Sequence, residues 1–132
     1  MIAADARLPD PMRAAMIAHA AESAPREACG LVAYDGAGRP ARLYRLTNVH
    51  PDPACFEIDP VEHFRVIRES EERGWRIGAV YHSHPTGRAR PSPTDLQARI
   101  DRDWISFIVG RSANRWTVVP FAIGRSGTRP IG

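Results

Sequence analysis

Hydrophobic residues near the start of the chain recur at the spacing of one helix face. The positions that share this face are four residues apart: Met12, Met16 and Ala20. Asp10 is suited to cap the helix, and Pro11 is suited to its first helical position. The pattern predicts a helix from residue 10 to about residue 23.

A second helix is predicted over about 60–73. The segment Asp59-Pro60-Val61-Glu62 matches a capping box with proline at the first helical position, and Gly74 ends the helix. The segment from Ser92 to Asp95 has the same kind of start, which predicts a short third helix to about residue 101.

Short apolar runs bounded by turn residues predict strands. CGLVAY over 29–34 indicates a buried strand, and the turn at 35–38 leads into its hairpin partner over 41–47. Three further strands are predicted, over 76–82, 104–109 and 115–123. Pro120 suggests that the last of them is an edge strand or carries a bulge, and the tail over 124–132 is expected to be loose. The chain is therefore predicted to be α+β, with five to six strands and about three helices.

Composition limits the class of protein. The chain has 132 residues, 43% of them hydrophobic, which predicts a single domain over 1–132 with its own core. No apolar run approaches the roughly 20 residues of a membrane-spanning helix, and the first residues do not resemble a secretory signal. Cys29 and Cys55 form no paired motif, so we expect a reducing, cytoplasmic location.

The charge is unevenly distributed. All 18 basic residues are arginine, which is typical of a GC-rich genome. Residues 1–80 carry 10 arginines against 12 acids, whereas residues 81–132 carry 8 arginines against 3 acids. A basic second half is compatible with a nucleic acid or with an acidic protein partner.

The segment from Tyr81 to Asp95 concentrates side chains suited to chemistry. His82 and His84 are two apart on a strand, so both imidazoles face one point at the rim of the sheet. The ten residues after His84 are enough for Asp95 to fold back and supply an oxygen. Two nitrogens and one carboxylate leave a fourth position open on zinc, which is typical of a catalytic site.

Each part of this set has a plainer interpretation. Most H-x-H pairs are surface or hydrogen-bonded histidines, and Ser92 with Asp95 is explained as a capping box. A hydrolytic metal site also needs a base, which spacing cannot select among the remaining acids. Glu27, just before the buried strand, is attractive, but its local sequence alone favours a solvated acid.

Together these residues resemble the motif of the JAMM metallopeptidases, also called MPN+ or Mov34/JAB. The matching residues are an upstream glutamate, Glu27, then His82-Ser83-His84-Pro85, then Ser92-Pro93-Thr94-Asp95. Gly30, Asn48 and the segment 56–60 also resemble the small bacterial members, and the resemblance covers about residues 10–123. It implies a curved, mainly antiparallel sheet flanked by helices, similar to the cytidine deaminases.

The resemblance implies one Zn²⁺ per chain. By this resemblance His82, His84 and Asp95 are the zinc ligands, Glu27 is the general base, and Ser92 stabilises the oxyanion. No other cofactor is implied. Because no motif position is substituted, the metal-free scaffold members of the family match poorly.

The resemblance also implies the partner. Small bacterial members cleave after the glycine-terminated tail of ubiquitin-like sulfur carriers of the ThiS/MoaD type, releasing cysteine or a short extension. The loops 48–58 and 85–91 would wall the tail, and Arg88 and Arg90 either pair with acidic groups or are simply solvated. Other duties of the fold remain open, such as a desampylase-like or phage-tail peptidase, as does a homodimer. A nucleic-acid-associated domain is disfavoured because aromatic and basic residues are not interleaved.

Overall fold

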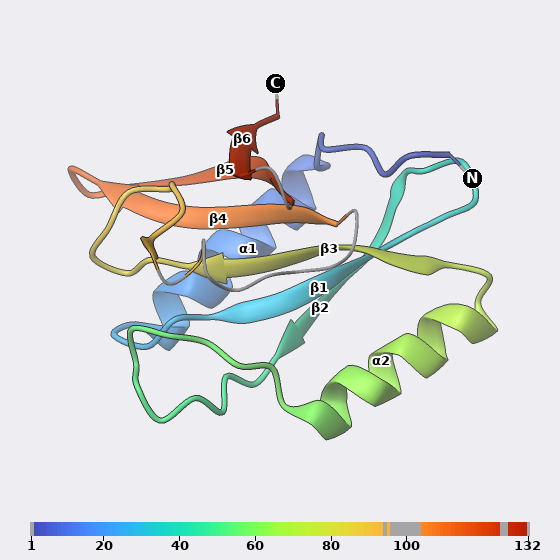
Figure 1. Ribbon diagram of the computed structural model, residues 1–132, viewed down its shortest axis with the longest axis horizontal. Helices are drawn as coiled ribbons and strands as arrows, with labels where there is room; N and C mark the ends of the chain where they lie inside the picture. Colours follow the sequence, from blue (N-terminus) through green and yellow to red (C-terminus); the bar gives the residue numbers. More distant parts are fainter. Residues whose placement is uncertain (1, 94, 96–103, 125–126, 132) are drawn as a thin grey trace.

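A computed structural model describes residues 2–93, 95, 104–124 and 127–131. Two helices, α1 (Asp10–Ser23) and α2 (Pro60–Glu72), accompany one six-stranded sheet. The strands are β1 (Cys29–Tyr34), β2 (Pro40–Leu46), β3 (Arg76–Ser83), β4 (Ile105–Ser112), β5 (Arg115–Gly124) and β6 (Gly127–Pro130). Their order across the sheet is β2-β1-β3-β4-β5-β6, and only the β3–β4 pair is parallel (Figure 1). The predicted α+β class and mainly antiparallel sheet are confirmed.

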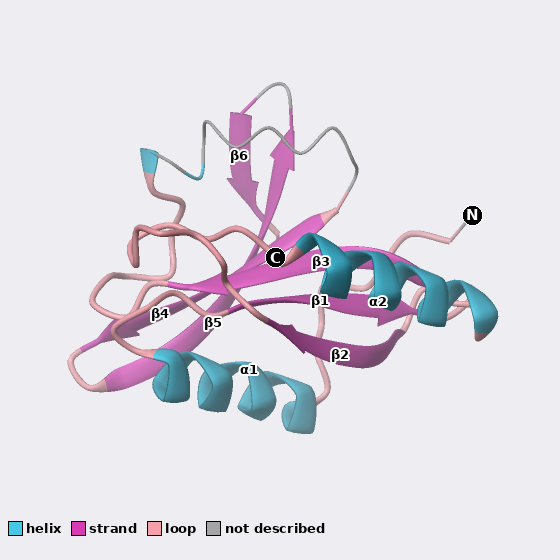
Figure 2. Ribbon diagram, turned by 90° about the horizontal axis from the view of Figure 1, so that it is seen from below, coloured by secondary structure: helices cyan, strands magenta, loops and turns pink. Residues whose placement is uncertain are grey.

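The two helices cover opposite faces of the sheet (Figure 2). Side chains alternate between these faces along β1. Val32 and Tyr34 pack in a core cluster with Met16 of α1, whereas Leu31 packs with Val66 of α2. All six residues of β1 are buried, as expected for a strand covered on both faces.

The helix starts differ in detail from the prediction. α1 begins at Asp10 itself, and Pro9 occupies the N-cap without a side-chain bond. Asp10 is therefore a favourable acid of the first turn rather than the cap. At α2, Asp59 does cap, since its carboxylate accepts the backbone N–H of Val61.

The other half of the capping box at α2 is used elsewhere. The backbone N–H of Asp59 donates to the carbonyl of Thr47, so it does not need the carboxylate of Glu62. Glu62 instead accepts from the backbone N–H and the hydroxyl of Thr47. The predicted helix start is confirmed, and its acid ties α2 to the end of β2.

The end of the chain departs from the expected loose tail over 124–132. Residues Gly127–Pro130 form β6, which pairs antiparallel with β5 over Phe121–Gly124. β5 is consequently an inner strand rather than an edge strand. The carbonyl of Pro120 accepts the N–H of Ile131, so it points away from β4. The N–H and C=O of one strand residue point to the same side, so the N–H that proline lacks would not have bonded to β4.

The third predicted helix lies mostly outside the described residues. Pro93 and Asp95 are helical, and the rest of its span to residue 101 falls among the residues that the structure does not describe.

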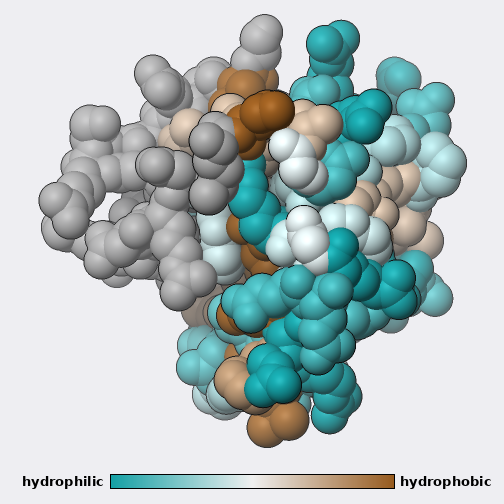
Figure 3. Space-filling model, turned by 90° about the vertical axis from the view of Figure 1, so that its right-hand side faces the viewer, coloured by the Kyte–Doolittle hydropathy of each residue, from teal (hydrophilic) through white to brown (hydrophobic). Residues whose placement is uncertain are grey.

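Within the described ranges, no helix combines the length and the apolar character needed to cross a membrane. Figure 3 views the end of the molecule that lies at the right of Figure 1, and hydrophilic side chains predominate over its lower half.

Candidate active site

The candidate site lies where β3 ends beside the start of β1. His82 faces Cys29 in the antiparallel register, so the segment just before β1 runs beside the segment just after β3. Ser83 fastens the two segments together, because its N–H donates to the carbonyl of Ala28 and its hydroxyl oxygen accepts the N–H of Ala28 at 2.8 Å. Glu27 is thereby held next to the two histidines.

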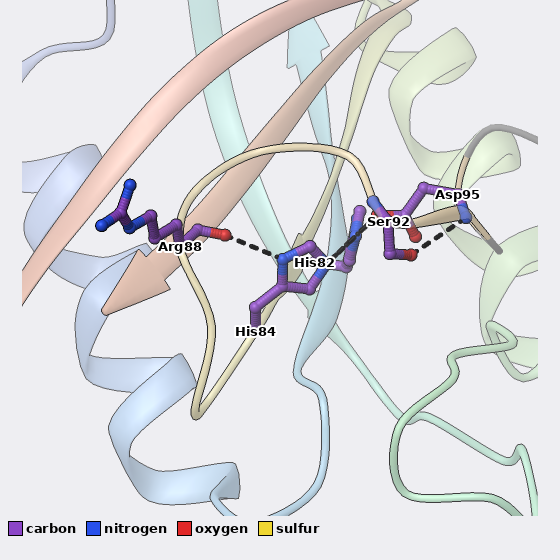
Figure 4. Close-up of polar contacts among 5 residues, drawn as sticks. All are labelled: His82, His84, Arg88, Ser92 and Asp95. Atoms are coloured by element: carbon purple, nitrogen blue, oxygen red, sulfur yellow. Dashed lines mark hydrogen bonds and ion pairs between the residues drawn. The ribbon is translucent and has the colours of Figure 1, made fainter. Parts of the chain in front are cut away.

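Three atoms that could act as metal ligands form a small triangle at this place. The Oδ2 atom of Asp95 lies 3.1 Å from Nε2 of His82 and 3.1 Å from Nε2 of His84, and the two Nε2 atoms are 3.2 Å apart. Figure 4 shows the three side chains meeting, with Asp95 approaching from the chain beyond the loop. The folded-back aspartate that the spacing allows is present.

The two imidazoles are held in different ways. The Nδ1 atom of His84 is 3.0 Å from the carbonyl oxygen of Arg88, whose side chain points away from the site (Figure 4). The Nδ1 atom of His82 is buried and has no hydrogen-bond partner among the described residues. The ring of Phe56 instead stacks on His82, with 4.6 Å between ring centroids.

Glu27 is buried beside these ligands, which excludes the interpretation as a solvated acid. Its side chain is only 7% exposed, and one ligating atom each from Glu27, His82 and His84 fit within 4.8 Å of one another. Burial raises the pKa of Glu27 to about 7, although nearby His84 lowers it. A carboxyl group with a pKa near neutrality is suited to both accept and return a proton.

The loop that follows β2 holds the backbone of Glu27. The side-chain amide of Asn48 donates to the carbonyls of Glu27 and Cys55, and the carbonyl of Pro53 accepts the N–H of Glu27. The oxygen of the Asn48 side chain accepts two further backbone N–H groups, so its hydrogen-bonding capacity is largely used. The position of Glu27 therefore depends on the conformation of this loop.

Ser92 and Asp95 form the reciprocal capping bonds that the sequence predicts. The N–H of Ser92 donates to Oδ2 of Asp95 at 2.9 Å, and the hydroxyl oxygen of Ser92 accepts the N–H of Asp95 at 3.1 Å. The capping box and the ligand triangle use the same carboxylate oxygen. The two interpretations of these residues are thus compatible, since the cap fixes the direction of the carboxylate.

The charges of the triangle favour a cation. Burial alone would raise the pKa of Asp95, but hydrogen bonds from His82 and His84 hold it well below its usual range. Burial lowers the pKa of His82. For His84, burial opposes but does not outweigh the bonds to Asp95 and to the carbonyl of Arg88, so its pKa is raised. An ionised carboxylate between imidazoles supplies the donors that zinc prefers.

The spacing of these donors tests whether zinc fits. Tetrahedral zinc with bonds of about 2.0–2.1 Å separates its ligand atoms by roughly 3.3 Å. The sides of the triangle, 3.1 to 3.2 Å, are close to that separation, and its donors are two nitrogens and an oxygen. The residues present therefore fit a zinc ion that His82, His84 and Asp95 would hold, with Glu27 close by.

A groove of about 380 Å³ opens onto this site. Glu27, His84 and Ser92 line it from within, and the two loops predicted as walls form its sides. The wall residues from these loops are Pro53, Ala54, Pro85, Thr86 and Gly87, and Pro25, which precedes β1, also lines the groove. A groove with small and proline-rich walls suits an extended peptide without bulky side chains.

The structure brings together all five residues that the sequence singles out: Glu27, His82, His84, Ser92 and Asp95. The sequence gives no role to Ser83, which fastens Glu27 to the histidines, or to the carbonyl of Arg88. Asn48 and Phe56 enter only through the family resemblance. The H-x-H alternation already places Ser83 on the opposite side of the strand from the ligands, and this is the signal that could have drawn attention to it.

The sequence and the fold were compared with those of known proteins. The family described as prokaryotic homologs of the JAB domain matches residues 9–120. A CysO-cysteine peptidase of Mycobacterium tuberculosis is 37% identical over 90 residues, covering 67% of this chain and 62% of the relative. A probable TtuB-protein conjugate cleaving protease of Thermus thermophilus is 40% identical over 61% of this chain and 53% of the relative. These two matches span less than two thirds of the length of each relative.

A desampylase of Haloferax volcanii matches over a longer span, with 32% identity over 88% of this chain and 86% of the relative. Among solved structures, a protein of Desulfitobacterium hafniense superposes with a TM-score of 0.83 at 30% identity, covering 99% and 90% of the two chains. A JAB1/MPN domain protein of Archaeoglobus fulgidus has a TM-score of 0.56 at 20% identity, with coverage of 92% and 90%, and shares the fold. With the family match over residues 9–120, the chain belongs to the prokaryotic JAB-domain family.

Proposed function

We propose that this protein is a zinc-dependent peptidase that cleaves the bond after the C-terminal glycine of a ubiquitin-like sulfur carrier. The observation that carries the proposal is the buried carboxylate of Glu27 beside His82 and His84, next to a groove that Glu27 and His84 line. A structural metal site would need neither a base nor an opening.

His82, His84 and Asp95 would hold the metal. Zinc would supply Lewis acidity to the scissile carbonyl and bring the pKa of a water molecule close to neutrality. Glu27 would take the proton of the attacking water and return it to the leaving amine. Its raised pKa and its place in the groove suit both transfers.

Ser92 would stabilise the oxyanion that develops on the carbonyl. Its oxygen already accepts the N–H of Asp95, which leaves its own O–H free to donate into the groove that it lines. A fixed donor of this kind contributes about 10²–10³ in rate.

The relatives and the groove together support the substrate class. The relatives are described as acting on CysO–cysteine and on TtuB conjugates, and a groove with small walls accepts a glycine-rich tail. We therefore propose a ThiS/MoaD-like carrier that ends in diglycine, with cysteine or a short extension as the leaving group. Cys29 and Cys55 are free thiols, which suits a cytoplasmic enzyme.

A second candidate is cleavage of an isopeptide bond between such a carrier and a protein lysine. The desampylase match favours it, because that match covers more of this chain than either of the other two relatives. Both candidates use the same site and differ only in what leaves from the tail.

Metal analysis combined with mass spectrometry tests the proposal. We expect about one zinc per chain, lost in His82→Ala and in Asp95→Ala, and retained in Glu27→Gln, which is inactive. Glu57→Gln changes an exposed glutamate outside the groove and should retain both zinc and activity. The substrate is a carrier with one cysteine after its diglycine, and the expected product has lost the mass of that cysteine.

The outcomes separate the alternatives. Unchanged activity in Glu27→Gln, or protein purified without chelators that contains no zinc, would contradict the metallopeptidase proposal. An intact cysteine adduct together with release of a lysine-linked carrier would favour the isopeptidase.

A further inference from the structure

We infer that four arginines beside the groove form a docking surface for an acidic face of the carrier protein. These residues, here called the basic rim, are Arg88, Arg90, Arg111 and Arg115, and all four are exposed. The inference rests on the proposed function, because it concerns how the carrier is held while its tail occupies the groove.

Backbone contacts place the loop arginines against the end of β4. The carbonyl of Gly87, a residue that lines the groove, accepts the N–H of Arg111 at 2.7 Å. A side chain on Gly110 would come within 2.0 Å of the backbone nitrogen of Ala89, so the loop rests directly on the strand. The rim is therefore continuous with one wall of the groove.

The β4–β5 hairpin adds the remaining part of the rim. Arg115 is the cross-strand partner of Ser112 at the turn between β4 and β5, and Arg111 and Trp116 are the next pair of cross-strand partners. Figure 1 shows this turn and the loop after β3 at the same end of the molecule, on the left. Residues that are distant in the sequence thus place positive charge on one side of the groove, whereas the opposite wall carries the acid Asp52.

Among the described residues, no acid pairs with an arginine of the rim. Outside the rim, five arginines pair with carboxylates: Arg7–Asp5, Arg39–Asp35, Arg42–Glu69, Arg45–Glu22 and Arg73–Glu69. Other described arginines, such as Arg65 and Arg68 on α2, also form no ion pair within the described ranges, so the rim is distinguished by its place beside the groove. Among described residues after position 80, the only acid is Asp95, whose carboxylate is engaged by the histidines.

Positive charge along one wall of a groove attracts a negatively charged partner and sets its orientation on encounter. A protein partner fits the rim better than a nucleic acid. The guanidinium of Arg111 lies 5.4 Å from the ring centroid of Trp116, so this aromatic face is covered by an arginine rather than open for base stacking. The groove between the two loops also suits a peptide tail extending from the docked protein.

The test measures binding and cleavage separately. Arg90→Glu/Arg115→Glu reverses two charges of the rim. The control Arg7→Glu/Arg68→Glu makes the same change in net charge at one site before α1 and one on α2. Both pairs are made in the active enzyme and in the Glu27→Gln background, and thermal unfolding confirms that each is folded.

We expect the rim pair to weaken binding of a diglycine-tailed carrier to the Glu27→Gln protein by about tenfold, and the control pair by less than about twofold. In the active enzyme, KM for the carrier should rise by a similar factor, whereas cleavage of a short peptide ending in Gly-Gly-Cys should not change. Salt should weaken binding to the protein with an intact rim more than binding to the rim variant.

Equal effects of the two variant pairs on carrier binding would overturn the inference. Cleavage of neither carrier nor peptide by the active enzyme would overturn the proposed function instead, and the binding experiment would still report on the rim. Oligonucleotide binding that the rim pair abolishes, with carrier binding unchanged, would assign the surface to nucleic acid and overturn docking of a carrier.

Discussion

The ring of Phe56 lies nearly parallel to the imidazole of His82, with 17° between the planes and 4.6 Å between the centroids. Metal-binding histidines usually fix their orientation by a hydrogen bond from the second ring nitrogen. In the described part of the chain, that nitrogen of His82 has no such partner. Packing by Phe56 therefore takes the role that the carbonyl of Arg88 has for His84.

Replacement of Phe56 by leucine should loosen zinc without unfolding the protein. We expect about tenfold weaker zinc affinity, because the imidazole of His82 becomes free to turn, and Phe56→Tyr should retain most of the affinity through its ring. Competition with a chromophoric chelator measures the affinity. Thermal unfolding of the metal-free proteins separates this effect from a general loss of stability, and equal zinc affinity in Phe56→Leu and the wild type would contradict the prediction.

Ser92→Ala tests the proposed oxyanion donor. We expect kcat to fall about 10²–10³-fold while zinc content is unchanged, because the hydroxyl acts on the developing charge and the backbone N–H of Ser92 still holds Asp95. Removal of the cap should also cost about 1 kcal/mol of stability. A variant that loses zinc along with activity would show that Ser92 acts through Asp95 instead.

Gly30→Ala should destabilise the fold. A side chain there would come within 2.2 Å of the Tyr81 ring and 2.3 Å of the backbone oxygen of Tyr44. Overpacking of this kind costs about 1–3 kcal/mol, and a backbone contact leaves little room for relief. Gly36→Ala is the matched control, since nothing lies within 4 Å of its added methyl group. Urea unfolding of both variants should show a lower midpoint for Gly30→Ala alone.

His19 should make the stability of the metal-free protein fall at acidic pH. Burial lowers the pKa of His19 from 6.5, and Arg45 lowers it further against the effect of Glu22. Below about pH 6.5 the unfolded chain therefore binds a proton more readily than the folded protein, so stability decreases as the pH falls.

Unfolding free energies between pH 7.5 and 5, measured with EDTA present, test this prediction. His19→Gln should show a smaller loss than the wild type over that range. Tyr81→Phe removes the hydroxyl that lies 2.7 Å from Nδ1 of His19 and controls for the lost hydrogen bond. An identical pH dependence in His19→Gln and the wild type would contradict the prediction.

Local patterns were sufficient to predict most of the elements. The helical spacing of Met16 and Ala20 and the unbroken apolar run of β1 correspond to buried positions in the structure, because core burial is what produces such patterns. β6 was missed because Gly127–Pro130 has no apolar pattern of its own. That strand forms through backbone pairing with β5, and this pairing cannot be recognised from the composition of the segment itself.

Only part of the candidate site could be predicted from local sequence. Side chains two apart on a strand share a face, so the direction of His82 and His84 follows from sequence, and the ten-residue loop makes the return of Asp95 feasible. The choice of Glu27 does not follow from its neighbours. Its burial depends on the antiparallel pairing of β1 with β3 and on Asn48, contacts between segments that are distant in the sequence.

Because β3 and β4 are parallel, the chain between them must return from the end of β3 to the opposite end of the sheet, where β4 begins. His82 and His84 lie before the loop 85–91 of this connection, and Asp95 lies after it. His82 belongs to the strand and Asp95 to the returning chain, so the zinc ion of the proposed function, bound between them, would close a loop of the fold as well as complete the active site. Stability and activity are then linked through free zinc, because any ion that binds only the folded form adds RT ln(1 + [Zn]/Kd) to the unfolding free energy. Under the proposed function, protein without zinc would therefore be both inactive and easier to unfold.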